Sequence, residues 1–228
     1  GQVSGVVTEA GTKLLEGRTP TEDAAVLKAA TAAGLVCLGK THLSEIAFSG
    51  LGLNPIMETP PCINDKDAVP GGSSSGAATS VAFGLAAAGI GSDTGGSVRI
   101  PSAWNDLVGL KTTHGRLSVT GVVALCAQFD TVGPLCRSVE DAGLLLAILE
   151  GSKPADLAGA SLKGARFAII DTLTMDSLRD APRAAFESAV QRLQAAGATV
   201  THIQMPEIHD AFDQAFNLYA ADSYGHWR

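Results

Sequence analysis

The sequence has few aromatic and charged residues, and its basic residues form no cluster. Of its 228 residues, 5% are aromatic and 17% are charged, and the formal net charge is -7. Proteins that bind nucleic acid or an anionic membrane through a basic surface carry the opposite charge balance. We therefore expect neither nucleic acid nor a membrane as a direct partner.

Long hydrophobic runs and metal-binding spacings are missing as well. The longest nearly apolar stretch, VAFGLAAAGIG at 81–91, is shorter than the roughly 20 residues that a membrane-spanning helix needs. The five histidines show no H-x-x-x-H spacing, so the sequence gives no support for a metal site. No C-x-x-C pair occurs among the cysteines, which are Cys37, Cys62, Cys126 and Cys136. Without a signal-peptide pattern at its start, the chain is expected to be cytoplasmic, with reduced thiols.

Helix and strand patterns alternate along the chain, and this alternation predicts an α/β protein. Hydrophobic residues make up 46% of the sequence, enough for a sizeable core. Thr19, Pro20 and Glu22 form a capping-box pattern that predicts the start of a helix. We expect a layered α/β/α architecture around a central mixed sheet. Helices are expected at 20–33, 41–48, 74–83, 138–150, 181–197 and 206–221, and strands at 35–38, 85–91, 165–170 and 199–203.

Residues 34–41, GLVCLGKT, fit the G-x-x-x-x-G-K-[ST] pattern of phosphate-binding loops. Such a loop follows a strand and curls its middle amides around the anion. Here a helix is expected before Gly34, and the apolar middle residues themselves favour a buried strand, so the match is interpreted as accidental. Two further short matches are set aside. Residues 72–76 fit G-x-S-x-G but follow a proline-rich loop, and the D-T-G tripeptide at 93–95 occurs once, whereas aspartic proteases need two carboxylates.

The most informative stretch is 69–116, where two Gly-Gly-Ser elements frame one expected helix and one expected strand. About ten helical residues advance the chain about 15 Å, and about seven strand residues return it about 23 Å. The two elements are therefore expected at one end of a sheet, where Ser73 and Ser97 could meet. Turns and caps would explain each residue singly but not the paired spacing. The backbone amides of the second element could point at one oxyanion, as in acyl transfer; they belong to Thr94, Gly95, Gly96 and Ser97.

The same stretch resembles the amidase signature family. Its elements GGSSSG, GSDTGGSVRIP and GLKTTHGR occur in the order that is typical of that family. The resemblance continues upstream through TEAGTKLLEGRTPTEDAAVL and LGKTHLSE, and downstream through FDTVGPLCRSVEDA. It implies that residues 1–228 form part of an amidase domain. The signature core would cover about 5–150, and a further α/β segment would cover about 161–228.

The resemblance also implies an activity and a set of site residues. The family hydrolyses carboxylic amides through an acyl-serine intermediate, which yields an acid and ammonia or an amine, and it uses a Ser–cis-Ser–Lys triad. Its pattern maps the nucleophile to Ser97, and the bridging serine, preceded by a cis peptide bond, to Ser73. The oxyanion donors would be the backbone amides of 94–97. Apart from the resemblance, Ser74 and Arg99 are candidates for binding a small-molecule amide, and Arg99 could bind a substrate carboxylate or form an ion pair that holds the loop. This chemistry needs neither a metal nor an organic cofactor, and a homodimer stays open as the assembly.

The catalytic lysine of the family is not expected within this sequence. The resemblance places it shortly before the segment that matches 4–13, ahead of Gly1, and assigns Lys40 to a separate G-K-T landmark. The 228-residue chain alone is therefore expected to turn over little or no substrate. A longer gene product with the lysine should become more active at alkaline pH. Asp93 and Asp130 are expected to be structural hydrogen-bond anchors.

Two other functions stay open at this point. Some family members release ammonia from glutamine within a multi-chain tRNA amidotransferase and need partner chains for this activity. The chain could also be an inactive, truncated amidase fold. A glutaminase assay with and without partner chains separates the first alternative from a free-standing amidase.

Overall fold

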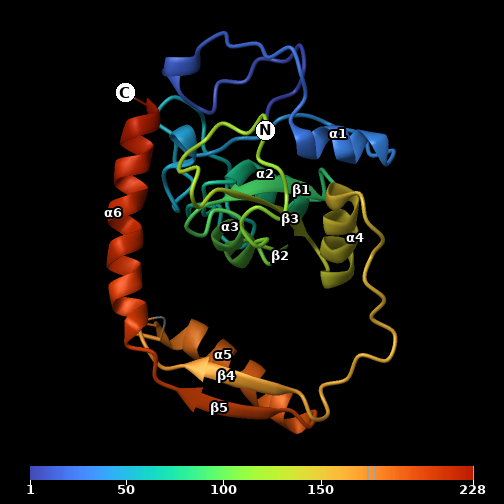
Figure 1. Ribbon diagram of the computed structural model, residues 1–228, viewed down its shortest axis with the longest axis vertical. Helices are drawn as coiled ribbons and strands as arrows, with labels where there is room; N and C mark the ends of the chain where they lie inside the picture. Colours follow the sequence, from blue (N-terminus) through green and yellow to red (C-terminus); the bar gives the residue numbers. More distant parts are fainter. Residues whose placement is uncertain (174, 177, 228) are drawn as a thin grey trace. The chain divides into compact units, whose positions relative to one another are not determined.

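The computed structural model describes residues 1–173, 175–176 and 178–227 of an α/β chain. These residues form two compact units. The first unit contains Gly1–Ala155 and the last residues from Asp222 onward, and the second contains Asp156–Ala221. Figure 1 labels the helices and strands of both units.

A three-stranded antiparallel sheet lies in the first unit (Figure 1). Its strands, in the order β1-β3-β2, are β1 (Gly89–Asp93), β2 (Val108–Gly109) and β3 (Thr131–Cys136). The central strand, β3, is buried along its whole length. The register pairs Asp93 with Thr131. The end of β1, where the second serine element begins, therefore lies beside the start of β3.

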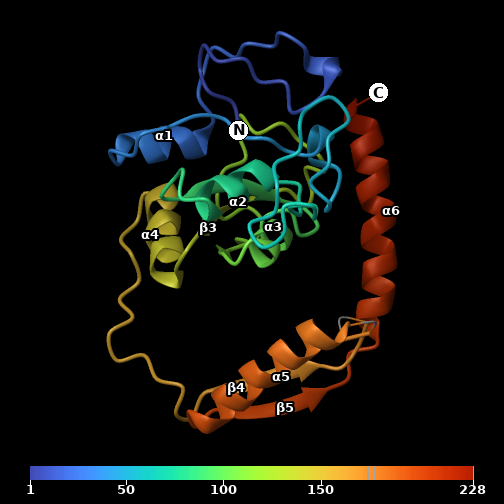
Figure 2. The ribbon, with the colours of Figure 1, turned by 180° about the vertical axis from the view of Figure 1, so that it is seen from behind.

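Helices of the first unit pack against this sheet or against one another. They are α1 (Ala25–Ala32), α2 (Ser75–Ala82), α3 (Arg99–Trp104) and α4 (Val139–Glu150), with 3-10 turns at Lys13–Leu15 and Glu45–Ala47. The small residues of α2 let it approach β1 closely, since a Cβ on Gly89 would stand 3.0 Å from the Ala77 carbonyl oxygen. Figure 2 shows α2 lying against the strands. A core cluster that includes Val26, Val132 and Leu145 joins α1, β3 and α4.

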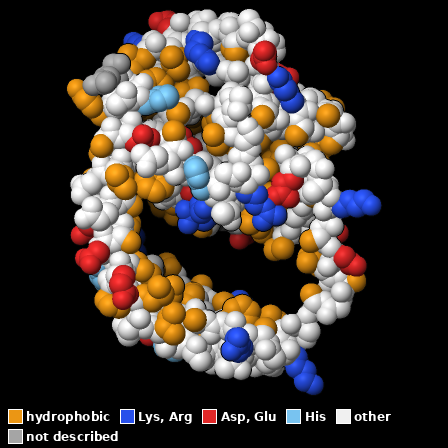
Figure 3. Space-filling model, in the orientation of Figure 1, with side chains coloured by type: hydrophobic (Ala, Val, Ile, Leu, Met, Phe, Trp, Pro, Cys, Tyr) orange, Lys and Arg blue, Asp and Glu red, His pale blue; other side chains and the backbone are white. Residues whose placement is uncertain are grey.

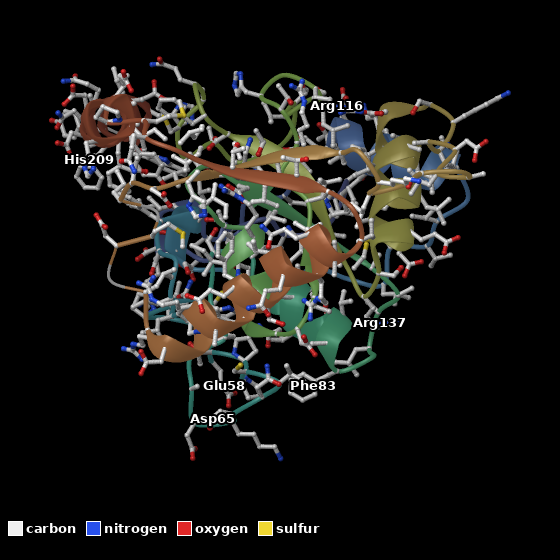
Figure 4. All side chains as sticks on the ribbon, turned by 90° about the horizontal axis from the view of Figure 1, so that it is seen from below. Glu58, Asp65, Phe83, Arg116, Arg137 and His209 are labelled. Atoms are coloured by element: carbon white, nitrogen blue, oxygen red, sulfur yellow. The ribbon has the colours of Figure 1, made fainter. Side chains whose placement is uncertain are left out.

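The C-terminal end of α2 is fixed by Arg137, the residue after β3. Its guanidinium donates to the Val81 carbonyl at 3.0 Å and to the Ala86 carbonyl at 3.1 Å. Figure 4 labels Arg137, which lies beside the end of α2. A cation at the end of a helix satisfies free carbonyl groups and interacts favourably with the helix dipole. The opposite end of α2, where the first serine element lies, is thereby set relative to β3.

The second unit contains a parallel pair of strands with a helical crossover, where the sequence predicts two strands and a helix. The strands are β4 (Arg166–Ile170) and β5 (Thr199–Ile203), and α5 (Asp180–Ala195) connects them. Parallel neighbours need such a crossover because a tight hairpin cannot connect them. The long helix α6 (Glu207–Trp227) follows, and its last residues, from Asp222, belong to the first unit.

The capping box expected at Thr19 does not form. The first helix begins at Ala25 rather than at Pro20, and the Thr19 hydroxyl donates instead to the Gly17 carbonyl at 3.2 Å. The reason is tertiary, because the N-terminal segment holds residues 20–23 outside the helix. Among these contacts, the Gly5 amide donates to the Pro20 carbonyl at 2.9 Å.

The strand expected at 35–38 is also absent. Val36 and Leu38 are 80% and 73% exposed, and none of the described strands pairs with this segment. A short apolar run becomes a strand only where a partner strand accepts its hydrogen bonds. The prediction of a buried strand here is therefore wrong for this structure.

Only the turn at Glu45–Ala47 forms within the helix expected at 41–48. Ile46 and Ala47 have positive φ angles, 44° and 62°, which break helical geometry. The neighbouring backbone pairs with the first serine element instead, since the Ser44 amide donates to the Ser73 carbonyl at 3.2 Å. The predicted helix is thus replaced by a loop that contacts the candidate site.

Membrane-spanning and metal-binding features can be assessed in the part of the chain that the structure describes. None of the helices in that part is both long and apolar enough to cross a bilayer. In the same part of the chain, no three His, Cys, Asp or Glu side chains gather as metal ligands. On the face shown in Figure 3, the Lys and Arg side chains stand apart from one another among acidic and hydrophobic ones.

Candidate active site

The first serine element lies between the proline-rich loop and α2, and residues 49–52 pack against its backbone. The Gly72 amide donates to the Gly50 carbonyl at 2.8 Å. A Cβ on Gly72 would lie 2.6 Å from the Gly52 nitrogen, so a side chain does not fit there. The peptide bond between Gly72 and Ser73 is cis, the conformation that the resemblance implies for a bridging serine. This packing holds Ser73 in the interior, with 1% of its surface exposed.

The second serine element is folded around the buried side chain of Asp93, at the end of β1. This carboxylate accepts the Gly96 amide at 2.7 Å and the Val98 amide at 3.1 Å. It also accepts Nε and Nη2 of Arg99, each at 2.9 Å. Burial by itself would raise the pKa of Asp93, but the hydrogen bonds and charge of Arg99, together with the two amides, hold that pKa below its usual value. Asp93 is therefore an ionised anchor of the loop, which confirms the role expected for it.

The two serine elements contact each other through their backbones. The Ser74 amide donates to the Ser97 carbonyl at 3.1 Å. The Ser74 hydroxyl donates to the carbonyl of Ser92 in β1 and accepts its amide, both at 3.2 Å. Ser97 is itself buried, with 8% of its surface exposed. The expected contact between the two elements at one end of the sheet is confirmed, but none of the described hydrogen bonds joins the hydroxyls of Ser73 and Ser97.

The two candidate substrate-binding side chains are both engaged within the protein. Ser74 is 7% exposed, and its hydroxyl is bound to the Ser92 backbone. Two guanidinium nitrogens of Arg99 are bound to Asp93, although 51% of the Arg99 side chain is exposed. The structure therefore shows both side chains in contacts that fix the two loops.

The Ser73 hydroxyl differs from its neighbours, because it has no hydrogen-bond partner among the described residues. The Ser75 hydroxyl, by contrast, lies 2.7 Å from Nδ1 of His42. Nothing in the sequence signals this contact, which joins residues 33 positions apart. Nε2 of His42 is buried without a partner among the described residues, and burial lowers the pKa of this imidazole. The Ser73 hydroxyl thus remains able both to accept and to donate a proton.

The backbone amides of 94–97 are not equivalent. The Gly96 amide already donates to Asp93 at 2.7 Å. The amides of Thr94, Gly95 and Ser97 donate to no carbonyl or carboxylate in the described part of the chain. Gly96 has a φ of 131°, and a Cβ there would come within 2.7 Å of the Ile100 side chain, so the tight turn requires glycine. Three free donors on one short loop beside a serine could bind an oxyanion.

Lys40 does not lie at the serine elements. Its Nζ donates to the Val7 carbonyl at 2.6 Å and to the Thr8 hydroxyl. Loss of hydration at the amine, followed by the nearby charge of Arg18, lowers the pKa of Lys40. The lysine of the G-K-T pattern thus contacts the N-terminal segment.

The comparisons with known proteins agree with the arrangement of these motifs. The family model described as Amidase matches residues 2–227. A glutamyl-tRNA(Gln) amidotransferase subunit of Anaeromyxobacter dehalogenans is 37% identical over 217 residues, which are 89% of this chain and 44% of the relative. Mandelamide hydrolase of Pseudomonas putida is 38% identical over 214 residues, which are 92% of this chain and 42% of the relative.

A solved structure gives the same result for the fold. The crystal structure of a glutamyl-tRNA(Gln) amidotransferase subunit from Thermotoga maritima superposes with a TM-score of 0.91 at 30% identity. The match covers 100% of this chain and 53% of that one. The chain thus spans about half the length of the relatives it matches. With a family model that matches nearly all of its residues, the chain belongs to the amidase signature family.

Proposed function

We propose that the full-length gene product cleaves the C–N bond of a linear carboxylic amide through an acyl-Ser97 intermediate. The products would be a carboxylic acid and ammonia or an amine. One observation carries this proposal: the Ser74 amide donates to the Ser97 carbonyl at 3.1 Å, so the Ser97 loop contacts the residue next to Ser73, whose buried hydroxyl has no partner among the described residues. The residues 1–228 would then be part of one amidase domain, with a signature core at about 5–150 and a further α/β segment at about 161–228.

The proposed reaction uses the two serines in sequence. Oγ of Ser97 attacks the amide carbonyl carbon and passes its proton to Oγ of Ser73, which passes its own proton to a base. The resulting oxyanion accepts hydrogen bonds from the amides of Thr94, Gly95 and Ser97. The proton returns through Ser73 to the leaving nitrogen as the C–N bond breaks. Water then attacks the acyl ester by the same proton route, which frees the acid and restores Ser97.

The base must come from a residue that contacts the Ser73 hydroxyl. Within the described residues no lysine amine binds this hydroxyl, and Lys40 is held by Val7 and Thr8. We assign the base to a lysine outside the 228 residues, in keeping with the family triad. The isolated chain should then be almost inactive, and the full-length protein should become more active as pH rises and the amine loses its proton.

Kinetics on the full-length protein test the proposal. Ammonia release from a panel of aryl and aliphatic amides should fall by roughly 10⁴-fold or more in Ser97→Ala and in Ser73→Ala, because residues that act as a unit fail together. Ser138→Ala is the matched control, since it removes a hydroxyl that caps α4 through the Asp141 amide at 3.0 Å, away from both serine elements. Unchanged hydrolysis in Ser97→Ala, with the wild-type rate in the control, would overturn the proposal.

A second candidate is supported by the names of the relatives. Two of the proteins compared above are glutamyl-tRNA(Gln) amidotransferase subunits. For this chain, the corresponding function would be release of ammonia from glutamine for a partner chain. Ammonia release from glutamine that rises strongly on addition of partner chains, with little activity on other amides, would favour this candidate over a free-standing amidase.

A further inference from the structure

The carboxylate of Asp130 ties the candidate oxyanion loop to a second loop. Asp130 immediately precedes β3 and is 5% exposed. Its Oδ1 accepts the Thr94 hydroxyl at 2.5 Å. Its Oδ2 accepts the Leu125 amide at 2.9 Å, and the Cys126 amide lies 3.1 and 3.2 Å from the two oxygens. One buried carboxylate thus bridges the loop at 125–126 and the first residue after β1.

The contact with Thr94 is reinforced by the neighbouring strand residue. The Thr131 hydroxyl donates to the Asp93 carbonyl at 2.6 Å, and Thr131 is also the register partner of Asp93. Residues 130 and 131 therefore both form hydrogen bonds with residues 93 and 94. Asp93 accepts the amides of Gly96 and Val98, so it fixes the later part of the loop. Asp130 fixes the start of the loop at Thr94.

The carbonyl groups of the loop at 124–126 bind the end of α6, which belongs to the same compact unit. The Ser223 hydroxyl donates to the Leu125 carbonyl at 2.8 Å, and Nε1 of Trp227 donates to the Ala124 carbonyl at 3.1 Å. Interactions of the Asp222 carboxylate with the Cys126 thiol, and with the backbone of the residues that follow Cys126, lower the pKa of Asp222. The last turns of α6 are therefore connected to Asp130 and the Thr94 hydroxyl through hydrogen bonds and the backbone of Leu125.

We propose that Asp130 is a positioning residue for amide hydrolysis, which it serves by orienting the 94–97 amides through the Thr94 hydroxyl. The end of α6, through Ser223 and Trp227, sets the place of Asp130. The inference rests on the proposed function of the Ser97 loop. The hydrogen bonds of the Asp130 carboxylate go to the Thr94 hydroxyl and to the amides of Leu125 and Cys126, so in this proposal its effect on the reaction passes through Thr94. This requirement separates a positioning role from a contribution to stability alone.

A double-mutant cycle on the full-length protein tests the path from Asp130 to Thr94. Asp130→Asn and Thr94→Val should each lower kcat by about 10- to 100-fold with little change in KM, because misplaced donors weaken binding of the transition state more than binding of the substrate. The double variant should be no slower than the slower single variant, and Thr94→Ser should restore kcat. Multiplied losses in the double variant, or failure of the serine to rescue, would overturn the inference.

The same design tests whether Ser223 and Trp227 of α6 set the position of Asp130. Ser223→Ala and Trp227→Phe remove one donor each and should lower kcat by about 3- to 10-fold. Neither should have a further effect in the Asp130→Asn background. Ser138→Ala is again the control, since loss of a helix cap lowers the melting temperature without moving this loop. If Ser223→Ala lowers only the melting temperature, as the control does, the claim that the end of α6 positions Asp130 is refuted.

Hydrogen exchange supplies a readout that does not depend on activity. In the full-length protein, peptides that cover 94–99 contain the amides held by Asp93, and Asp130→Asn, Thr94→Val and Ser223→Ala should all speed their exchange. Peptides from α4 should speed up only in Ser138→Ala. Unchanged exchange at 94–99 in the first three variants would overturn the inference whether or not the enzyme is active. If exchange changes as expected but no hydrolysis depends on Ser97, the proposed function fails instead.

Discussion

Substitution of Asp93 by asparagine should destabilise the first unit strongly. The Asp93 carboxylate is fully buried and accepts the Gly96 and Val98 amides and two nitrogens of Arg99. Asparagine keeps one oxygen and presents an NH₂ group that cannot accept a hydrogen bond. At least one buried amide therefore loses its acceptor, and Arg99 loses its counter-charge.

The size of the loss follows from these contacts. Breaking one side of a buried ion pair costs about 3–5 kcal/mol, and an unsatisfied buried donor costs about 1–3 kcal/mol. Because 51% of the Arg99 side chain is exposed, water can rehydrate it and reduce the first cost. We expect the free energy of unfolding to fall by roughly 2–4 kcal/mol at pH 7.

Urea unfolding followed by tryptophan fluorescence measures this loss. The sequence has two tryptophans, and both Trp104 and Trp227 lie in the first unit. Because folding lowers the pKa of Asp93, its stabilising contribution is complete above about pH 4 and is lost as pH falls through the lower, folded-state pKa. The difference between wild type and Asp93→Asn should therefore shrink below about pH 4. Asp141→Asn, an exposed site, is the matched control.

Two results would refute this account of Asp93. A loss below about 0.5 kcal/mol at pH 7, similar to that expected for an exposed substitution, would show that the carboxylate does not organise the loop. A loss that stays constant from pH 7 to pH 3 would show that its charge is not involved.

Three further predictions concern packing, thiol chemistry and pH dependence. Gly72→Ala should lower the urea midpoint sharply, since the new Cβ would stand 2.6 Å from the Gly52 nitrogen; an unchanged midpoint would contradict the close packing of these segments. Iodoacetamide at pH 8 should alkylate the exposed Cys37 but not Cys126, because burial and the nearby Asp222 raise the pKa of the Cys126 thiol to about 11; mass spectrometry that finds Cys126 modified in folded protein would contradict this. In the full-length protein, kcat/KM should rise with pH from 6 to 9, and a flat profile would argue against a lysine base.

The elements that the sequence predicts well are those with local signals. The helix at Val139–Glu150 begins at Ser138, whose hydroxyl accepts the Asp141 amide at 3.0 Å, and ends at Gly151 with a φ of 65°. These are the capping contacts that the sequence itself displays. The strands Arg166–Ile170 and Thr199–Ile203 likewise match their apolar runs within one residue.

The elements that the sequence does not reveal depend on distant contacts. β3 contains Gly133 and Pro134, which argue against a central strand, yet it lies between β1 and β2. A Cβ on Gly133 would lie 2.0 Å from the Leu110 carbonyl oxygen, so glycine here permits close approach. The need for glycine at position 133 can be recognised only when the position of the neighbouring segment at Leu110 is known.

The candidate site also contains some features that the sequence predicts and others that it does not. The paired Gly-Gly-Ser elements and the spacing between them predict that Ser73 and Ser97 come together, because one helix and one strand set the distance. The engagement of the Gly96 amide by Asp93, and of the Ser75 hydroxyl by His42, could not be predicted. Both depend on side-chain directions in loops, which no periodic pattern specifies.

Covalent labelling of the nucleophile tests the central claim most directly. The full-length protein would be treated with a fluorophosphonate, which reacts with activated serines, and the modified peptide would be identified by mass spectrometry. The account predicts one adduct on Ser97, lost in Ser97→Ala and much slower to form in Ser73→Ala. An adduct on another serine, or amide hydrolysis that continues in Ser97→Ala, would contradict it.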